Sequence, residues 1–291
     1  APWRMLYWMY HRKGEKAMIH ICYSGNKRVF PGLLLSVLSV VRHTRRAVRV
    51  YVLSMDMREQ DEAFVPFSQN QMQILDAVLK EANPASGAEL LDVTAHYRAT
   101  LAAGKNADNY YTPYTLLRLY LNEFAGLPDK LLYLDIDTMC ASDVAQLYDI
   151  DVEGYEYAAA LDYMGHFWIH RRYCNAGVLL LNMKEIRQTR LFERAREYVF
   201  THKMIMPDQT ALHKLGKRRL YLPRRFNEQR GLREDTVVKH FCRGIRWLPF
   251  FHIYNIKQWQ REEVHKKLKI HYFDDVYARY DELAAKYDLK K

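Results

Sequence analysis

Short apolar segments of strand length alternate with segments of helical periodicity along most of this chain, and that alternation constrains the fold more than any other feature. Residues 18–23 and 48–53 are predicted as strands, and the apolar residues of 33–41 between them recur at the three- and four-residue spacing of a helix. Further strands are predicted at 90–93, 130–134, 157–161 and 177–181, and further helices at 72–79, 114–124 and 184–200. Strands that alternate with helices favour a mostly parallel sheet with helices on both faces. The sequence therefore predicts an α/β fold with a Rossmann-like central sheet.

Composition indicates one well-packed body rather than a disordered or fibrous chain. Of the 291 residues, 49% are hydrophobic and 13% aromatic, which excludes intrinsic disorder, and 12 Gly and 9 Pro are too few for a collagen-like chain. We expect a main domain at 18–254 and a C-terminal helical tail at 255–291, where Val276, Tyr280, Leu283 and Tyr287 form an apolar stripe. For the N-terminal extension, 1–17, three interpretations stay open: an interfacial anchor, a helix packed on the main domain, or a segment foreign to the native chain.

The cysteines and apolar segments favour a reduced, cytoplasmic protein. Cys22, Cys140, Cys174 and Cys242 are widely separated and form no C-x-x-C pair, which argues against a zinc site or a thioredoxin-type motif. The longest apolar stretch, 33–41, is too short to cross a bilayer. The N-terminal segment lacks the charge order and the small residues of a signal peptide.

Two carboxylates directly after a buried strand are the most informative local feature. Asp135 and Asp137 follow the apolar strand at 130–134 and are separated by one residue. Ligands of open α/β sheets bind at the carboxyl ends of the strands, and hard divalent cations prefer oxygen ligands. Alternate residues of an extended chain face opposite ways, so both carboxylates can reach one ion only if the chain turns there. A metal site and an ordinary solvated turn both remain open on this pattern alone, whereas Ser142 and Asp143 indicate only a helix start.

Five groups of segments occur in an order that resembles a known family. They are ICYSGN (21–26), RLYLNE (118–123), LYLDIDT (132–138), NAGVLLLN (175–182) with PDQTAL (207–212), and RFN (225–227) with HFC (240–242). Together they resemble the retaining GT-A glycosyltransferases of family 8, which include glycogenin and bacterial lipooligosaccharide galactosyltransferases. The resemblance covers about 18–247 and implies a GT-A fold for the main domain.

The resemblance implies a metal ion and a nucleotide-sugar. It makes Asp135, Asp137 and His240 the ligands of Mn²⁺ (or Mg²⁺), which holds the diphosphate of a UDP-sugar and neutralises it as the glycosidic bond breaks. The residues expected to contact the UDP-sugar are Cys22, Tyr23, Ser24, Asn26, Arg118, Ile136, Asp162, Asn175, Ala176 and Gly177. Asp208 and Gln209 are expected to face the reacting sugar. Without the resemblance, Arg118 would be interpreted as an ion-paired helix residue and Asp208 as part of a helix N-terminus.

The implied reaction transfers a hexose, glucose or galactose, from UDP-sugar to an acceptor hydroxyl on a glycan, glycolipid or glycoprotein, with retention of configuration. We expect front-face attack, with Gln209 stabilising the oxocarbenium-like centre. The alternative is a covalent intermediate on Asp208 or Gln209, of which the amide is the poorer nucleophile.

Two positions depart from the family pattern. Ser24 stands where many relatives carry an acidic residue that accepts the uracil N–H. The usual signature His-x-x-Gly-x-x-Lys-Pro-Trp is altered after His240, and Arg246 stands near the place of the diphosphate-binding lysine. Arg246 is therefore the predicted diphosphate contact, with Arg243 as the alternative if the loop has slipped.

The net charge of +10 leaves other partners to consider. Basic residues cluster at 214–233, but no nucleic-acid-binding motif accompanies them, and no nucleic-acid partner is expected. Peripheral association with an anionic membrane at the inner face fits the charge better. A sugar nucleotidyltransferase is the second alternative, although the loop at 24–27 is short for its glycine-rich phosphate loop. A basic binding protein without catalysis is the third.

Overall fold

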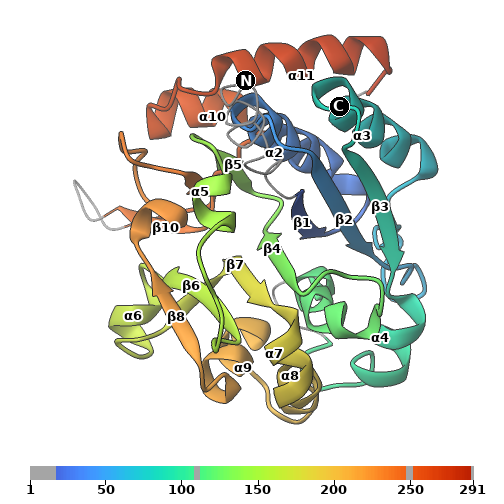
Figure 1. Ribbon diagram of the computed structural model, residues 1–291, viewed down its shortest axis with the longest axis vertical. Helices are drawn as coiled ribbons and strands as arrows, with labels where there is room; N and C mark the ends of the chain where they lie inside the picture. The colour runs from blue at the N-terminus through green and yellow to red at the C-terminus, as the bar shows by residue number, and fades with distance from the viewer. Residues whose placement is uncertain (1–17, 108–111, 247–251, 290–291) are drawn as a thin grey trace, which may run out of the picture.

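A seven-stranded mixed sheet forms the centre of the protein (Figure 1). The computed structural model describes residues 18–107, 112–246 and 252–289. The strand order is β3-β2-β1-β4-β7-β6-β8. The bounds are β1 Ile19–Ser24, β2 Val48–Ser54, β3 Gly87–Asp92, β4 Lys130–Leu134, β6 Tyr157–Leu161, β7 Cys174–Asn182 and β8 Arg219–Leu222. Only β7 runs antiparallel to its neighbours, β4 and β6, and the other four pairings are parallel. The predicted mostly parallel α/β sheet is confirmed.

Helices cover both faces of the sheet, as predicted. One face carries α2 (Phe30–His43), α3 (Gln69–Ala82) and α11 (Asp274–Lys286). The other carries α4 (Thr94–Thr100), the 3₁₀ helix η2 (Pro113–Glu123), α7 (Met183–Thr189), α8 (Leu191–Thr201) and α9 (Pro207–Leu215). Shorter elements are η1 (Lys27–Val29), α5 (Ala145–Tyr148), α6 (Gly165–Trp168), η3 (Arg224–Phe226), α10 (Arg261–Glu263) and the π-helical η4 (Val264–Leu268). Two small antiparallel pairs join β5 (Thr138–Cys140) to β9 (Val238–His240) and β10 (Gly244–Arg246) to β11 (His252–Tyr254).

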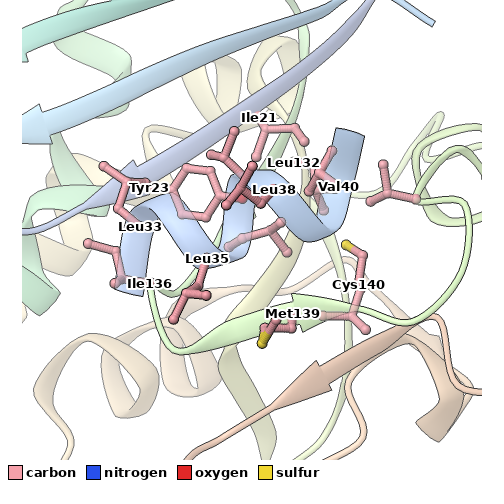
Figure 2. Packing of buried hydrophobic residues seen from close by; sticks show 14 of the residues in the cluster. Ile21, Tyr23, Leu33, Leu35, Leu38, Val40, Leu132, Ile136, Met139 and Cys140 are labelled. Carbon is pink, nitrogen blue, oxygen red and sulfur yellow. The ribbon is translucent and has the colours of Figure 1, made fainter. Parts of the chain in front are cut away.

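Alternate residues of the strands divide between two hydrophobic cores. In β1, Ile21 and Tyr23 belong to the core under α2, while Cys22 between them belongs to the core on the opposite face. Figure 2 shows the first core, where Leu33 and Leu38 of α2 lie among residues of β1, β4 and β5. Burial on both faces explains why these strands are continuous apolar runs.

The predicted helix at 184–200 is wrong, because the structure contains two helices there. Arg190 adopts a left-handed conformation, with φ of 53°, between α7 and α8. Met183 and Ile186 form the buried stripe of α7, and an unbroken helix would place Arg190 on that stripe. The break changes the phase, so that the buried Leu191 and Phe192 begin the apolar face of α8. No glycine or proline marks the break in the sequence.

The C-terminal region packs on the same core as α2. Phe273, Val276 and Leu283 are almost fully buried in that core, and Tyr280 and Tyr287 of the predicted stripe are partly buried against it. Figure 1 shows α11 lying across α2 and α3. Within the described ranges, no helix combines the length and the apolar character that a bilayer span requires.

The four cysteines carry no disulfide. Cys22, Cys140 and Cys174 are buried as expected for small apolar side chains, and Cys242 is half-buried. Burial raises the pKa of the Cys174 thiol to about 11, so it stays protonated at neutral pH.

Candidate active site

The chain turns sharply after β4, which brings the two carboxylates to one side. The backbone N–H of Thr138 donates to the carbonyl of Asp135 at 3.1 Å, and the Thr138 hydroxyl donates to the same oxygen at 2.8 Å. The backbone N–H of Asp135 donates to Gly177 O at 2.7 Å, which ties the turn to β7. Two carboxylates separated by one residue can reach one ion only if the chain turns between them, and the structure contains that turn.

Pairing between β5 and β9 brings His240 to the same place. Thr138 lies opposite His240 in that antiparallel pair. His240 Nε2 is 3.1 Å from Asp137 Oδ1 and 3.9 Å from Asp135 Oδ2. The three side chains each present a ligand atom, and these atoms lie within 4.8 Å of one another.

A chain of amide groups orients the imidazole. Asn227 Nδ2 donates to Asn175 Oδ1 at 2.9 Å, which turns Asn227 Oδ1 toward His240 Nδ1 at 3.1 Å. The Asn227 carbonyl oxygen accepts at Nδ1, and this bond directs His240 Nε2 at the carboxylates, the arrangement found behind metal-binding histidines. Asn175 Oδ1 also accepts from the Gly177 N–H at 2.9 Å. Asn227 lies within a segment quoted for the family resemblance but was not assigned a role from the sequence.

Gly177 permits the close approach that this cluster needs. A Cβ at this position would lie 2.2 Å from His240 Cε1 and 2.7 Å from Asp135 Oδ2. No side chain could be accommodated without displacing both groups.

Asp162 joins the end of β6 to α9. Its Oδ2 accepts from Asn175 Nδ2 at 2.8 Å and from Gln209 Nε2 at 3.2 Å. Gln209 Oε1 in turn accepts from the Ala176 N–H at 2.9 Å. The predicted residues Asp162, Asn175, Ala176, Gly177 and Gln209 thus form one hydrogen-bonded unit beside the carboxylate–histidine cluster.

Arg118 is a buried cation between two carboxylates. Its guanidinium lies 2.8 Å from Asp135 Oδ1 and 3.2 Å from Asp208 Oδ2, and it stacks on the Tyr133 ring at 4.2 Å. It also donates to the carbonyls of Ala176 and Thr115. The side chain is 2% exposed and engaged on every nitrogen, so it holds Asp135 and Asp208 in place. Direct contact with the nucleotide-sugar stays a prediction.

Burial and charge act in opposite directions on two carboxylates of the site. Burial raises the pKa of Asp208, against the opposing influence of Arg118. Burial also acts to raise the pKa of Asp137, but Lys257 and His240 outweigh it and hold that pKa well below its usual range. Asp137 is therefore an anion at neutral pH, as a cation ligand must be.

The side chains predicted to bind the nucleotide in the first loop are buried or hydrogen-bonded within the protein. The side chains of Cys22 and Tyr23 are fully buried on opposite faces of β1, and Ile136 is 7% exposed. Ser24 Oγ lies 2.6 Å from the Tyr133 hydroxyl. Asn26 caps η1, because its Oδ1 accepts from the Arg28 N–H at 3.2 Å while its Nδ2 donates to Ala63 O. Nucleotide contacts by these residues remain predictions that would use backbone groups or small rearrangements.

Lys257 is the cation at Asp137, and it was not predicted from the sequence. Its Nζ donates to Asp137 Oδ2 and, at 3.2 Å, to Phe241 O. The predicted Arg246 belongs to β10, and its side chain lies outside the described part of the structure. The hairpin of β10 and β11 separates His240 from Lys257. Lys257-Gln258-Trp259 resembles the Lys-Pro-Trp end of the family signature and was the missed signal.

The donor set fits the implied metal. Two carboxylate oxygens and one imidazole nitrogen suit Mn²⁺ and are compatible with Mg²⁺. A second group, His265, His271 and Asp274, also gathers three ligand atoms among the described residues. Its His265 Nε2 and Asp274 Oδ1 are 2.7 Å apart, and its residues lie in the C-terminal segment from η4 to α11, which contains none of the predicted site residues.

The fold and this site define a GT-A glycosyltransferase. The chain matches the model of glycosyl transferase family 8 over residues 20–274 and belongs to that family. It is 21% identical over 251 residues to a putative glycosyltransferase of Haemophilus influenzae, covering 77% of this chain and 71% of that protein. It is 32% identical over 124 residues to the lipopolysaccharide 1,2-glucosyltransferase of Escherichia coli, covering 38% of this chain and 37% of that one.

Solved structures support the same fold. A galactosyltransferase LgtC in complex with donor and acceptor sugar analogues superposes with a TM-score of 0.63 at 20% identity, covering 92% of this chain and 96% of that one. The glycosyltransferase GlyE of Streptococcus pneumoniae superposes with a TM-score of 0.61 at 18% identity, covering 91% and 64%. The GT-A expectation is confirmed.

Proposed function

We propose that this glycosyltransferase moves a hexose from a UDP-sugar to an acceptor hydroxyl, with retention and with dependence on Mn²⁺ or Mg²⁺. The observation that carries the proposal is the convergence of Asp135, Asp137 and His240, with Lys257 beside them. A cluster of two carboxylates, one imidazole and one ammonium suits a divalent ion and the diphosphate that it binds.

Each group of the site has a distinct role in this proposal. Asp135, Asp137 and His240 would hold the ion, which when bound neutralises the diphosphate leaving group. Lys257 is placed to pair with a diphosphate oxygen once an anion enters. Asp162, Asn175 and Gln209 would orient the sugar through its hydroxyls, and the backbone at Ala176 and Gly177 would lie beneath it.

The contacts of Asp208 and Gln209 favour front-face attack over a covalent intermediate. Asp208 is buried and 3.2 Å from the Arg118 guanidinium, and both ends of the Gln209 amide are hydrogen-bonded. In front-face attack, the acceptor oxygen bonds to the anomeric carbon on the side from which the phosphate oxygen leaves. That phosphate oxygen takes the acceptor proton. A glycosyl adduct on Asp208 in mass spectrometry would contradict this pathway.

Asp137→Asn tests the metal site. The amide keeps the size of the side chain but removes the charge that pairs with the ion, so we expect metal-dependent release of UDP from UDP-hexose to fall at least about a hundredfold. Circular dichroism should show an unchanged fold. The matched control is Asp143→Asn, because the Asp143 carboxylate accepts from the Ala145 N–H at 2.9 Å and an amide oxygen preserves that bond. Full activity in Asp137→Asn would refute the assignment.

A panel of UDP-glucose, UDP-galactose and other nucleotide-sugars, each with Mn²⁺ or Mg²⁺, identifies the donor by the same UDP-release measurement. Pyrophosphate formation from a sugar phosphate and a nucleoside triphosphate would instead indicate a nucleotidyltransferase. The acceptor is proposed to be a glycan, glycolipid or glycoprotein. Peripheral membrane association stays a prediction, which sedimentation with anionic liposomes at rising salt would test.

A further inference from the structure

An apolar pocket borders the proposed sugar site. It has a volume of about 430 Å³ and is lined by Tyr163, Met164, Phe167, Trp168 and Ile245. The first four residues belong to the loop after β6 and to α6, and Ile245 belongs to the hairpin that follows His240. One wall therefore begins at the residue after Asp162, and the other lies five residues after His240.

Asp162 connects the pocket to the site. Its Oδ1 accepts from the backbone N–H groups of Met164 and Gly165 at 3.0 and 2.5 Å. Its Oδ2 faces Asn175 and Gln209. One carboxylate thus positions both the pocket wall and the residues proposed to orient the donor sugar. A ligand in the pocket would lie next to the sugar being transferred.

The wall of the pocket is unusually exposed for such large apolar side chains. Phe167 is 70% exposed and Trp168 71% exposed, on consecutive positions. Tyr163 packs edge-to-face against Phe167 with 6.3 Å between ring centroids. Aromatic faces left open beside a polar site provide the platform on which a sugar ring can place its apolar C–H face.

Arg230 adds a positive charge at the rim. Its guanidinium stacks over the Tyr163 ring at 4.6 Å and forms no ion pair within the described ranges. Its neighbours Arg224 and Arg233 are paired with Glu228 and Asp235. Stacking on Tyr163 leaves the edge of the Arg230 guanidinium available for an anionic group.

We propose that this pocket binds an anionic sugar unit of the acceptor, with its ring against Phe167 and Trp168 and its phosphate or carboxylate against Arg230. The proposal deepens the proposed function and rests on it. It adds the class of acceptor, a saccharide that carries a negative charge close to the hydroxyl that is glycosylated.

Binding of simple probes to the full chain tests the pocket without turnover. Glucose 6-phosphate and glucuronate are the anionic probes and glucose is the neutral match, each titrated by saturation-transfer NMR. We expect both anionic probes to bind, and glucose to bind about tenfold more weakly. Trp168→Ala and Arg230→Gln should each weaken glucose 6-phosphate binding about tenfold. The controls Tyr221→Ala, which removes an exposed aromatic on β8, and Arg233→Gln, which removes a paired arginine, should bind it like the unmodified protein.

Equal affinity for glucose and glucose 6-phosphate, or unchanged affinity in either pocket variant, would overturn the proposal. A second outcome would also overturn the proposal, in favour of a lipid surface. In that outcome the protein binds no saccharide but sediments with phosphatidylglycerol vesicles, and Trp168→Ala abolishes the sedimentation. Titration with UDP and Mn²⁺ separates this proposal from the donor assignment. If the protein binds UDP but no saccharide probe, the pocket proposal is wrong and the donor site stands. If the protein does not bind UDP, the proposed donor site is wrong.

Discussion

Asp137 contacts two partners at once, the His240 imidazole through one carboxylate oxygen and the Lys257 ammonium through the other. At the scale of single residues, this arrangement puts the Lys257 ammonium where the proposed diphosphate would bind. The sequence pattern favoured Arg246, whereas the structure places the Lys257 ammonium at the carboxylate cluster. The two side chains can be distinguished by substitution.

Lys257→Met should weaken UDP binding in the presence of Mn²⁺ by about tenfold or more, because a charge-assisted hydrogen bond to phosphate contributes about 1.5–3 kcal/mol. Isothermal titration calorimetry measures the change. Lys266→Met is the matched control, since Lys266 is an exposed lysine paired with Glu262 at 3.2 Å. A larger loss in Arg246→Met than in Lys257→Met would restore the prediction made from the family signature.

Asp208 provides a test of electrostatics through pH. Its pKa is raised by burial, so its contribution to stability is full below the unfolded value of about 3.9 and declines as the pH rises through the folded pKa. Asp208→Asn has no charge to desolvate. We expect the variant to be more stable than the unmodified protein by about 1 kcal/mol at pH 7.5, with the difference shrinking at pH 4.5. Urea unfolding at both pH values measures it. A destabilised variant at pH 7.5 would show that the ion pair with Arg118 outweighs the burial of the charge.

At the scale of elements, two short pairings build the site from distant segments. β5 and β9 bring His240 to the turn after β4, and α9 presents Gln209 to the backbone of β7. Neither pairing follows from local periodicity, because each joins segments far apart in the chain.

The junction between α7 and α8 offers a test of local backbone strain. Arg190 is left-handed with φ of 53°, a conformation that costs a residue with a Cβ about 1 kcal/mol. Arg190→Gly should therefore stabilise the protein by about 0.5–1 kcal/mol in urea unfolding. Glu197→Gly, an exposed position inside α8, should instead destabilise it by about 1 kcal/mol. Destabilisation by both substitutions would contradict the strain at the junction.

At the scale of the whole molecule, the C-terminal helix and the α/β sheet share one core. Gln258 Nε2 donates to Ile136 O at 2.6 Å, and the Tyr277 hydroxyl donates to Gln258 O at 2.8 Å. Phe273 packs against Phe241, the residue after His240, with 6.3 Å between ring centroids. The tail predicted from the sequence thus supports the back of the active site.

Phe273→Ala should lower the free energy of unfolding by about 3–5 kcal/mol, because the ring is fully buried. Since the ring belongs to the common core, we expect a single calorimetric transition at a lower temperature. Tyr287→Ala, at a partly buried position near the end of the same region, should cost less. Two separate transitions in Phe273→Ala would instead support an independently folding tail.

The distribution of charge is also a property of the whole molecule. Arg218, Arg224 and Arg233 of the basic segment 214–233 are paired with Glu185, Glu228 and Asp235. Ion pairs therefore neutralise three of the eight Lys and Arg residues of this segment. The charge of Arg118 is ion-paired inside the site. The guanidinium of Arg230 lies over the Tyr163 ring at the rim of the apolar pocket.

Local sequence was sufficient for six strands of the central sheet, for α2, α3 and α11, and for the acidic pair, whereas β8 and the short strands outside the sheet were not predicted. A buried strand or an amphipathic helix repeats its apolar residues over a few positions, so the pattern reports which side is buried. The apolar run 130–134 indicated a buried strand that ends at Asp135 and Asp137. The order of the segments quoted above indicated the family. The helix break at Arg190 was not predicted, because no glycine or proline accompanies it.

Only the tertiary structure decided how the site closes. The pairing of β5 with β9 brings His240 to Asp137, and His240 in turn contacts Asn227. The packing of the segment after β11 brings Lys257 to Asp137, and neither arrangement leaves a periodic signal. The same holds for the aromatic pocket, which lies between α6 and a hairpin distant in sequence. Sequence alone determined the apolar segments of most central strands and that two carboxylates follow a buried strand. The choice of their partners depended on long-range packing, in which the chain brings remote side chains within a few ångströms of one another.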